Sequence, residues 1–114
     1  MLVHRGEIYY CDLSPTKGCE QGGLRPVLII QNEMGNKHAP TTIVAPLTSR
    51  MGKKHLPTHI AVPHEYSNMP ADSIVLCEQV RTIDKSRLQS KVGYIDEDGM
   101  KKVSFALMVS LGLN

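Results

Sequence analysis

Residues 20–32 of the chain read EQGGLRPVLIIQN, a polar, glycine-containing segment that passes directly into a continuous apolar run. The run Pro26–Ile30 is short and rich in β-branched residues, which is typical of a buried central strand, and Pro26 stands at its first position, where a missing backbone donor is tolerated. The preceding segment, Thr16–Leu24, carries three glycines and predicts a loop. Arg25 is therefore expected at a loop-to-strand junction.

Further strands are expected on both sides of this run. Gly6–Leu13 alternates along its length and stops at a Ser-Pro pair. The other expected strands are Thr42–Leu47, interrupted by Pro46 and followed by Thr48, then Thr58–Val62 and Ser73–Thr82. The connections are expected to be a polar loop over Asn32–Thr41 and a basic segment over Met51–Leu56. Five short strands separated by turn signals predict a barrel or a sandwich.

Towards the end of the chain, the spacing of apolar residues changes from that of a strand to that of a helix. Met100, Val103, Leu107 and Leu111 fall at helical spacing, and the acidic residues 96–98 stand where a helix N-terminus favours negative charge. We expect a final amphipathic helix packed against the β-structure. The whole is therefore mostly β with short helices, and residues 1–114 contain no repeat or linker that would divide this single domain.

The composition limits the class of protein but does not indicate a function. The chain has 114 residues, 41% of them hydrophobic and 21% charged, and a formal net charge of +2. Such a mild basic excess permits a nucleic-acid partner but does not indicate one. The three cysteines form no short pairing motif, the N-terminus has no secretory pattern, and no apolar run is long enough to span a bilayer. A cytoplasmic location away from membranes is expected.

Three common kinds of site are disfavoured by spacing. His55 and His59 would lie about 13 Å apart along a strand, too far to share a metal ion. Cys11 and Cys77 stand in expected strands and are predicted to be packed residues, while Cys19 lies in the glycine-rich loop. That loop leads into a strand, whereas nucleotide-binding glycine motifs lead into a helix. We therefore expect no metal and no cofactor.

Four blocks of sequence, in order along the whole chain, resemble one known family. They are residues 20–32 quoted above, RGEIYY at 5–10 with Asp12 and Leu13 after it, IVAPLTS at 43–49, and DSIVLCEQVRTIDK at 72–85. Together they are similar to the MazF/PemK (EndoA-type) toxin endoribonucleases. The resemblance implies an SH3-like (PemK/CcdB-type) small β-barrel with a C-terminal helix. It also implies a homodimer that cuts single-stranded RNA without metal and is inhibited by an acidic, MazE-like antitoxin.

The resemblance places Arg25 and Thr48 at the family's catalytic positions, and their chemistry suits RNA cleavage. Without a metal, the RNA 2′-hydroxyl attacks the adjacent phosphate, so the protein must stabilise phosphate charge and move two protons. Arg25 offers a planar set of donors and Thr48 a hydroxyl. The residues alone leave other roles open, because Arg25 could pair with Glu20 and Thr48 could cap a turn. The general base is not identified, since arginine is a poor proton acceptor.

Several polar residues are candidates for assisting the reaction or holding bases. Glu20, Gln79 and His59 come first, in that order, and Asn32, Ser73 and Lys17 are further candidates. The loop from Ser14 to Gly23 contains no aromatic ring on which a base could stack, so the resemblance does not carry over a cleavage sequence. The alternatives are a non-catalytic gyrase-binding toxin of the same fold, like CcdB, and a plain SH3-like binding module.

Overall fold

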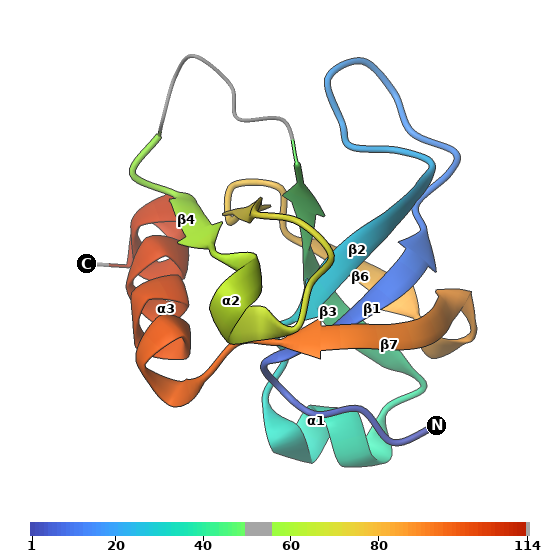
Figure 1. The fold of residues 1–114 in the computed structure, drawn as a ribbon. Coiled ribbons are helices and arrows are strands. Elements are labelled where there is room, and N and C mark those ends of the chain that lie inside the picture. The colour runs from blue at the N-terminus through green and yellow to red at the C-terminus, as the bar shows by residue number, and fades with distance from the viewer. Residues whose placement is uncertain (50–55, 114) are drawn as a thin grey trace.

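The computed structural model describes residues 1–49 and 56–113. Within them the chain forms a seven-stranded, antiparallel sheet with helices at its margins (Figure 1). In chain order the elements are β1 (Glu7–Asp12), β2 (Leu24–Ile29), α1 (Glu33–His38), β3 (Thr41–Thr48), β4 (His59–Val62), α2 (His64–Ser67), β5 (Ser73–Leu76), β6 (Arg81–Asp84), the 3₁₀ helix η1 (Lys85–Arg87), β7 (Leu88–Tyr94) and α3 (Glu97–Leu111).

The strands follow the order β4-β5-β3-β2-β1-β7, and β6 pairs with β3 outside that path. Strand β3 is the centre of the arrangement, because it pairs with β2, with β5 near Thr48, and with β6 over Thr41–Val44. The sheet curls into a barrel-like shape that stays open, since β4 and β7 lie at opposite ends of the described path. The expected small β-barrel with a C-terminal helix is confirmed.

Both faces of the central strands are buried, each in a different core. One core joins alternate residues of β1, β2 and β3, such as Ile8, Leu28 and Leu47, to Met100 and Val103 of α3. The other collects the residues between them, namely Val3, Tyr9, Cys11, Leu13, Val27, Ile29, Val44, Ile83 and Leu88. Continuous apolar runs such as 27–30 follow from this double burial, because a strand covered on two sides needs no polar face.

The expected loop over Asn32–Thr41 is wrong, because this segment contains helix α1. The Asn32 side chain accepts a hydrogen bond from the Gly35 N–H at 2.8 Å, which caps the first turn. Asn36 is buried and connects Gln31 to Thr42 through its side-chain amide. A polar helix held by buried amides shows no apolar period, so the sequence pattern resembled that of a loop.

The expected single strand over Ser73–Thr82 is also wrong. The chain turns after Leu76, where the Gln79 N–H donates to the Leu76 carbonyl at 3.0 Å, and then continues as β6. β5 and β6 pair with opposite ends of β3. Strand β7 was missed altogether because most of its side chains are exposed. The described sheet thus has seven strands in place of the expected five.

The structure also differs from the sequence-based expectations at two prolines and at the end of α3. β3 runs through Pro46 without interruption. Pro26 is the third residue of β2, in the part that pairs with β1 only, because the ladder to β3 begins at Val27. Arg25 therefore lies within the strand. On α3, Met100 and Val103 are buried as expected and Leu107 is partly buried, but Leu111 at the last turn is 58% exposed.

Candidate functional site

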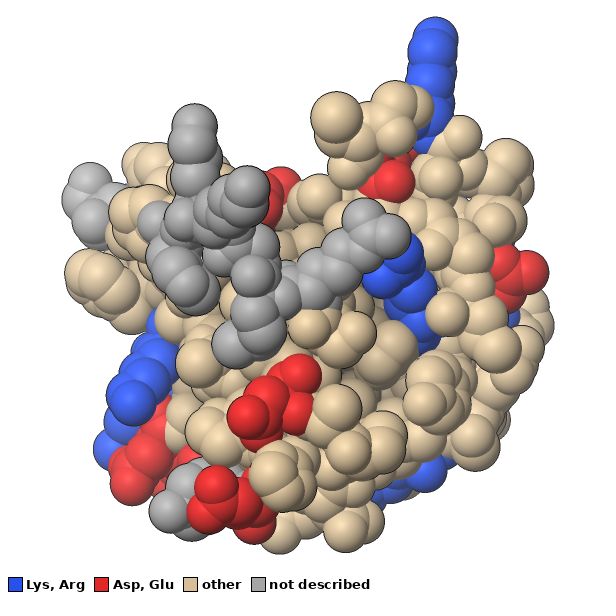
Figure 2. Space-filling model, turned by 45° about the horizontal axis from the view of Figure 1, so that its top comes forward, with Lys and Arg blue, Asp and Glu red and all other residues tan. Residues whose placement is uncertain are grey.

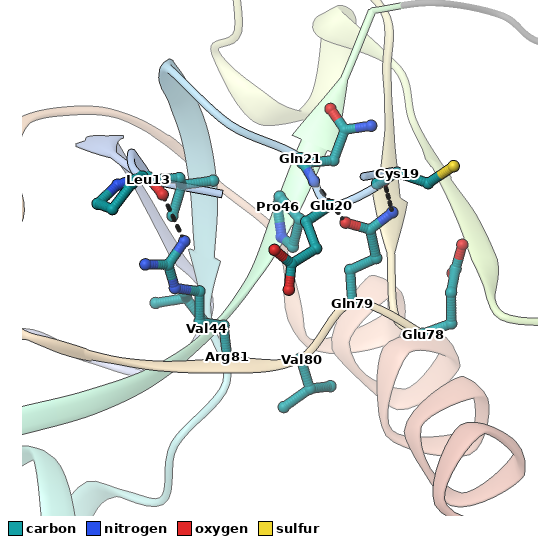
Figure 3. A pocket seen from close by; sticks show the side chains of 11 residues that line it. Leu13, Cys19, Glu20, Gln21, Val44, Pro46, Glu78, Gln79, Val80 and Arg81 are labelled. Atoms are coloured by element: carbon teal, nitrogen blue, oxygen red, sulfur yellow. Dashed lines mark hydrogen bonds between the residues drawn. The ribbon is translucent and has the colours of Figure 1, made fainter. Parts of the chain in front are cut away.

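A cleft of about 590 Å³ opens between the loop that joins β1 to β2 and the turn that joins β5 to β6 (Figure 3). Its floor comes from β3 and its walls from these two connections and the end of β1. The lining residues are Leu13, Pro15, Cys19, Glu20, Gln21, Val44, Pro46, Glu78, Gln79, Val80 and Arg81. The cleft combines apolar surface with a few charged and amide groups, which is typical of a binding site.

Gln79 fastens one wall of the cleft to the other (Figure 3). Its side-chain oxygen accepts a hydrogen bond from the Gln21 N–H at 2.8 Å, and its side-chain nitrogen donates to the Cys19 carbonyl at 3.4 Å. Both ends of the amide are therefore used by the protein backbone. Gln79 was predicted to assist the reaction or to hold bases, whereas in the structure its side chain fixes the shape of the glycine-rich loop.

Arg25 also holds this loop. Its Nε donates to the Gly22 carbonyl at 2.7 Å. Within residues 1–49 and 56–113 the two terminal nitrogens, Nη1 and Nη2, have no hydrogen-bond or carboxylate partner. The guanidinium is thus oriented by one nitrogen while the other two remain available to an anion, an arrangement well suited to a phosphate.

Thr48 is the last residue of β3, which pairs with β2, the strand that carries Arg25. The β2–β3 ladder ends at the pair Val27–Pro46, and the same register extended by two residues would set Arg25 opposite Thr48. Directly opposed residues of an antiparallel pair share a face, so both project to the side of Val27 and Pro46. Neither lines the cleft itself, but Pro46 does, and Thr48 follows Pro46 by two residues on the same strand.

Glu20 and Lys17 lie in the glycine-rich loop. A Glu20 carboxylate oxygen accepts a hydrogen bond from the Lys17 N–H at 2.5 Å. Glu20 lines the cleft, where Figure 3 shows its carboxylate between Pro46 and Gln79. The Lys17 side chain is exposed on the same loop. The alternative in which Glu20 neutralises Arg25 is not found, because the described part of the chain has no ion pair between them.

His59 reaches the site indirectly, through Glu78. His59 Nε2 lies 2.9 Å from a Glu78 carboxylate oxygen, and the other oxygen accepts from the Thr58 hydroxyl at 3.0 Å. Burial tends to raise the pKa of Glu78, but these hydrogen bonds outweigh it and hold the pKa below its usual value. Glu78 is thus kept as a carboxylate at the edge of the cleft. His55, with which His59 was compared, lies outside the described residues.

Asn32 and Ser73 are not brought into the cleft. Asn32 caps α1, beyond the opposite end of β2 from Arg25 (Figure 1). Ser73 is buried, and its hydroxyl donates to the Ala71 carbonyl at 3.3 Å. Both side chains therefore have structural partners.

Arg81 is a cleft residue that the sequence analysis did not single out. It is the first residue of β6, opposite Val44 of β3, and its Nη1 donates to the Leu13 carbonyl at 2.6 Å. In a single strand over Ser73–Thr82, the side chain of Arg81 would lie on the same face of the sheet as that of Val75. The turn at 77–80 instead puts it on the face of Val44 and Pro46. A correctly placed turn would have identified it.

Among the residues that the structure describes, Lys and Arg and Asp and Glu are scattered over the largely uncharged face shown in Figure 2. Within the described part of the chain, no cluster of three or more His, Cys, Asp or Glu side chains could hold a metal ion. No helix there is long and apolar enough to cross a membrane.

Residues 4–111 match the family described as PemK-like, MazF-like toxin of type II toxin-antitoxin system. The chain belongs to this family. It is 48% identical over 113 residues to the endoribonuclease MazF of Staphylococcus saprophyticus, a relationship that covers 99% of this chain and 94% of the relative. The family expected from the sequence is confirmed, and so is the enzyme class, endoribonuclease.

Solved MazF structures share the fold. MazF of Deinococcus radiodurans superposes with a TM-score of 0.83 at 26% identity, covering 98% of each chain. An endoribonuclease from a mycobacterial species, solved with its cognate antitoxin, superposes with a TM-score of 0.76 at 27% identity and covers 99% of this chain and 96% of its own. The PemK/MazF fold therefore extends over nearly the entire chain.

Proposed function

We propose that this PemK/MazF toxin cuts single-stranded RNA at specific sequences, without a metal ion, by attack of the RNA 2′-hydroxyl on the adjacent phosphate. Growth inhibition follows when messenger RNA is the target. The observation that carries the proposal is the geometry of Arg25. Its Nε is fixed by Gly22, its other two nitrogens have no partner among residues 1–49 and 56–113, and the β2–β3 register extended past Val27 and Pro46 would bring Thr48 level with it.

The chemistry assigned to the two residues is charge stabilisation. As the 2′-oxygen bonds to phosphorus, negative charge grows on the non-bridging oxygens, and the open Arg25 nitrogens donate to them. The Thr48 hydroxyl donates to a phosphate oxygen. The bond to the 5′-oxygen then breaks, giving a 2′,3′-cyclic phosphate upstream and a 5′-hydroxyl downstream. Donors held before the substrate arrives need little rearrangement during the reaction.

Two proton transfers remain, one from the 2′-hydroxyl and one to the 5′-oxygen. Glu20 is our first candidate for the base because its carboxylate lies in the cleft and is exposed to an incoming RNA. His59 is the second, although its ring is 13% exposed and bonded to Glu78. Lys17 is assigned to a phosphate and Gln79 to the loop that presents Glu20.

Single-stranded RNA is favoured over duplex because a narrow cleft with Pro46 and Val80 in its lining can receive a base only when that base is unpaired. An acidic antitoxin would compete for the same arginines, since carboxylates and phosphates use the same donors. We also propose a cytoplasmic homodimer. Helix α3 exposes Phe105 by 61% and Met108 by 41%, apolar surface that a second copy would cover.

The test uses a long single-stranded RNA incubated with the purified protein in excess chelator, with the cuts mapped. A second RNA carries 2′-deoxyribose at one mapped site. We expect cutting in chelator, no cutting at the deoxy position, and a 5′-hydroxyl on the downstream fragment. Activity that returned only with added magnesium or zinc would contradict metal independence. Cutting at the deoxy position, or a downstream 5′-phosphate, would contradict the nucleophile.

A further inference from the structure

Two arginines hold three consecutive carbonyls at the point where β1 ends and the glycine-rich loop begins. Arg81 Nη1 donates to the Leu13 carbonyl at 2.6 Å. Arg87 Nη1 donates to the carbonyls of Asp12 and Ser14 at 3.2 and 3.0 Å. Both charges act on the neighbouring Cys11, which places them on the same part of the molecule. The two arginines are therefore alike as anchors of the loop.

Arg81 and Arg87 differ in the surroundings of their remaining guanidinium nitrogens. Arg81 lines the cleft and Arg87 does not. Within residues 1–49 and 56–113, Nε and Nη2 of Arg81 have no protein partner, and no carboxylate pairs with the side chain. The two carboxylates of the cleft have other partners, because Glu20 accepts from the Lys17 backbone and Glu78 from Thr58. A fixed cation thus faces the cleft with two donors unused.

Its position relative to Arg25 follows from the strand register. Arg81 pairs with Val44 of β3, and the β2–β3 register extended by two residues past Val27 and Pro46 would bring Arg25 level with Thr48 of the same strand. Four residues of strand span about 13 Å. Residues 44, 46 and 48 share a face, so the two arginines mark the ends of one line along the cleft floor, with Pro46 between them.

We propose that Arg81 binds the phosphate of a nucleotide that flanks the cleaved one, through its Nε and Nη2, and so fixes the register of the RNA along β3. The inference rests on the proposed function and adds a second phosphate position to it. Arg81 contributes to substrate binding and makes no contact with the reacting phosphate. Its loss therefore acts on KM and on the salt dependence of binding, whereas loss of Arg25 acts on kcat.

The experiment compares Arg81→Gln with Arg87→Gln, a matched pair in which each variant loses one positive charge and keeps a side-chain amide donor on the side of the carbonyls at residues 12–14. Arg81→Lys restores the charge. The ligand is a single-stranded RNA with 2′-deoxyribose at the mapped cut site, and its affinity is measured over a range of salt concentrations. Each phosphate contact with single-stranded nucleic acid contributes about 0.7 to the slope of log affinity against log salt.

We expect the slope to fall by about 0.7 in Arg81→Gln, to remain at the parental value in Arg87→Gln, and to recover in Arg81→Lys. On the cleavable RNA, Arg81→Gln should raise KM about tenfold with kcat within about threefold of the parent, the pattern of a binding contact shared by ground and transition states. An Arg81→Gln slope equal to the parent's, in a protein that cuts RNA, would overturn this inference alone. A parent that left RNA intact would overturn the proposed function as well.

Discussion

The Nε of Arg25 donates to the carbonyl of Gly22, three residues earlier, at 2.7 Å, so that the guanidinium is held by the loop on which it borders. The bond fixes the plane of the group and leaves Nη1 and Nη2 for a ligand. Binding a phosphate thus depends on both the positive charge of Arg25 and the fixed plane of its guanidinium. A substitution can remove one of these without the other.

Arg25→Ala should reduce the cleavage rate by about 10²-fold or more, which is the usual effect of losing a preorganised donor to developing charge. Arg25→Lys keeps the charge but loses the planar donor set, and we expect a loss nearly as large. Thr48→Ala should change the rate in the same direction. Rates are measured on single-stranded RNA, with circular dichroism as the control for folding. Parental rates in well-folded Arg25→Ala and Thr48→Ala would show that the site is misassigned.

Gln79 should act through the loop. Because its side-chain oxygen accepts from the Gln21 N–H, Gln79→Ala should expose that amide and speed its hydrogen exchange, while cleavage slows. Gln79→Glu keeps an acceptor for Gln21 but loses the donor to Cys19, so exchange at Gln21 should stay close to the parental rate. Exchange is followed residue by residue by NMR. Unchanged exchange at Gln21 in Gln79→Ala would argue for a direct contact with RNA instead.

Acid should weaken the fold through Glu78. Its pKa is below the ordinary 4.5 in the folded protein, so at pH values between the two the unfolded chain binds more protons. The stabilisation is therefore complete above about pH 4.5 and is lost as the pH falls through the folded pKa. Glu78→Gln should flatten the dependence of the free energy of unfolding on pH in that window. Exposed Glu65→Gln is the control, and an equal flattening in both variants would refute the assignment to Glu78.

One of the three thiols should react with a thiol reagent in the folded protein. Cys19 is exposed, whereas Cys11 and Cys77 are buried. Burial, with the charge of Glu78, raises the pKa of Cys77 to about 11, and burial also raises that of Cys11 against the opposing charges of Arg87 and Arg81. Mass spectrometry should find one fast label, three after denaturation. Since Cys19 lines the cleft, labelling should inhibit cleavage, and Cys19→Ser should be resistant.

The elements that could be predicted from the sequence are those with a strong local pattern of residues. β1, the apolar part of β2, and α3 were located because their period or composition is strong, whereas the assignment of Arg25 and Thr48 to catalysis comes from the family resemblance and stays a prediction. Helix α1 escaped because its stability comes from the cap at Asn32 and the buried amide of Asn36, which have no periodic signal. Strand β7 escaped because most of its side chains are exposed.

The residues that line the cleft could not be predicted locally, because they depend on the tertiary structure. A turn of a few residues between β5 and β6 reverses which side chains face the floor, so Arg81 could not be assigned before the turn was known. The partnership of Gln79 with Cys19 and Gln21 joins residues about 60 positions apart, beyond the reach of any local rule. Long-range backbone contacts of this kind appear only in the folded chain.

Strand β3 pairs with β2, β5 and β6, and Thr48 is its last residue. Thr48 itself pairs with Ile74 of β5, while the ladders to β2 and β6 hold the residues before it, so displacing β3 as a whole requires breaking ladders on both of its sides, which is close to unfolding the whole chain. Heat should then inactivate the enzyme and melt it at the same temperature, with no range in which a folded but inactive form accumulates. The toxin would be active wherever it is folded, and only something that covers the cleft could restrain it.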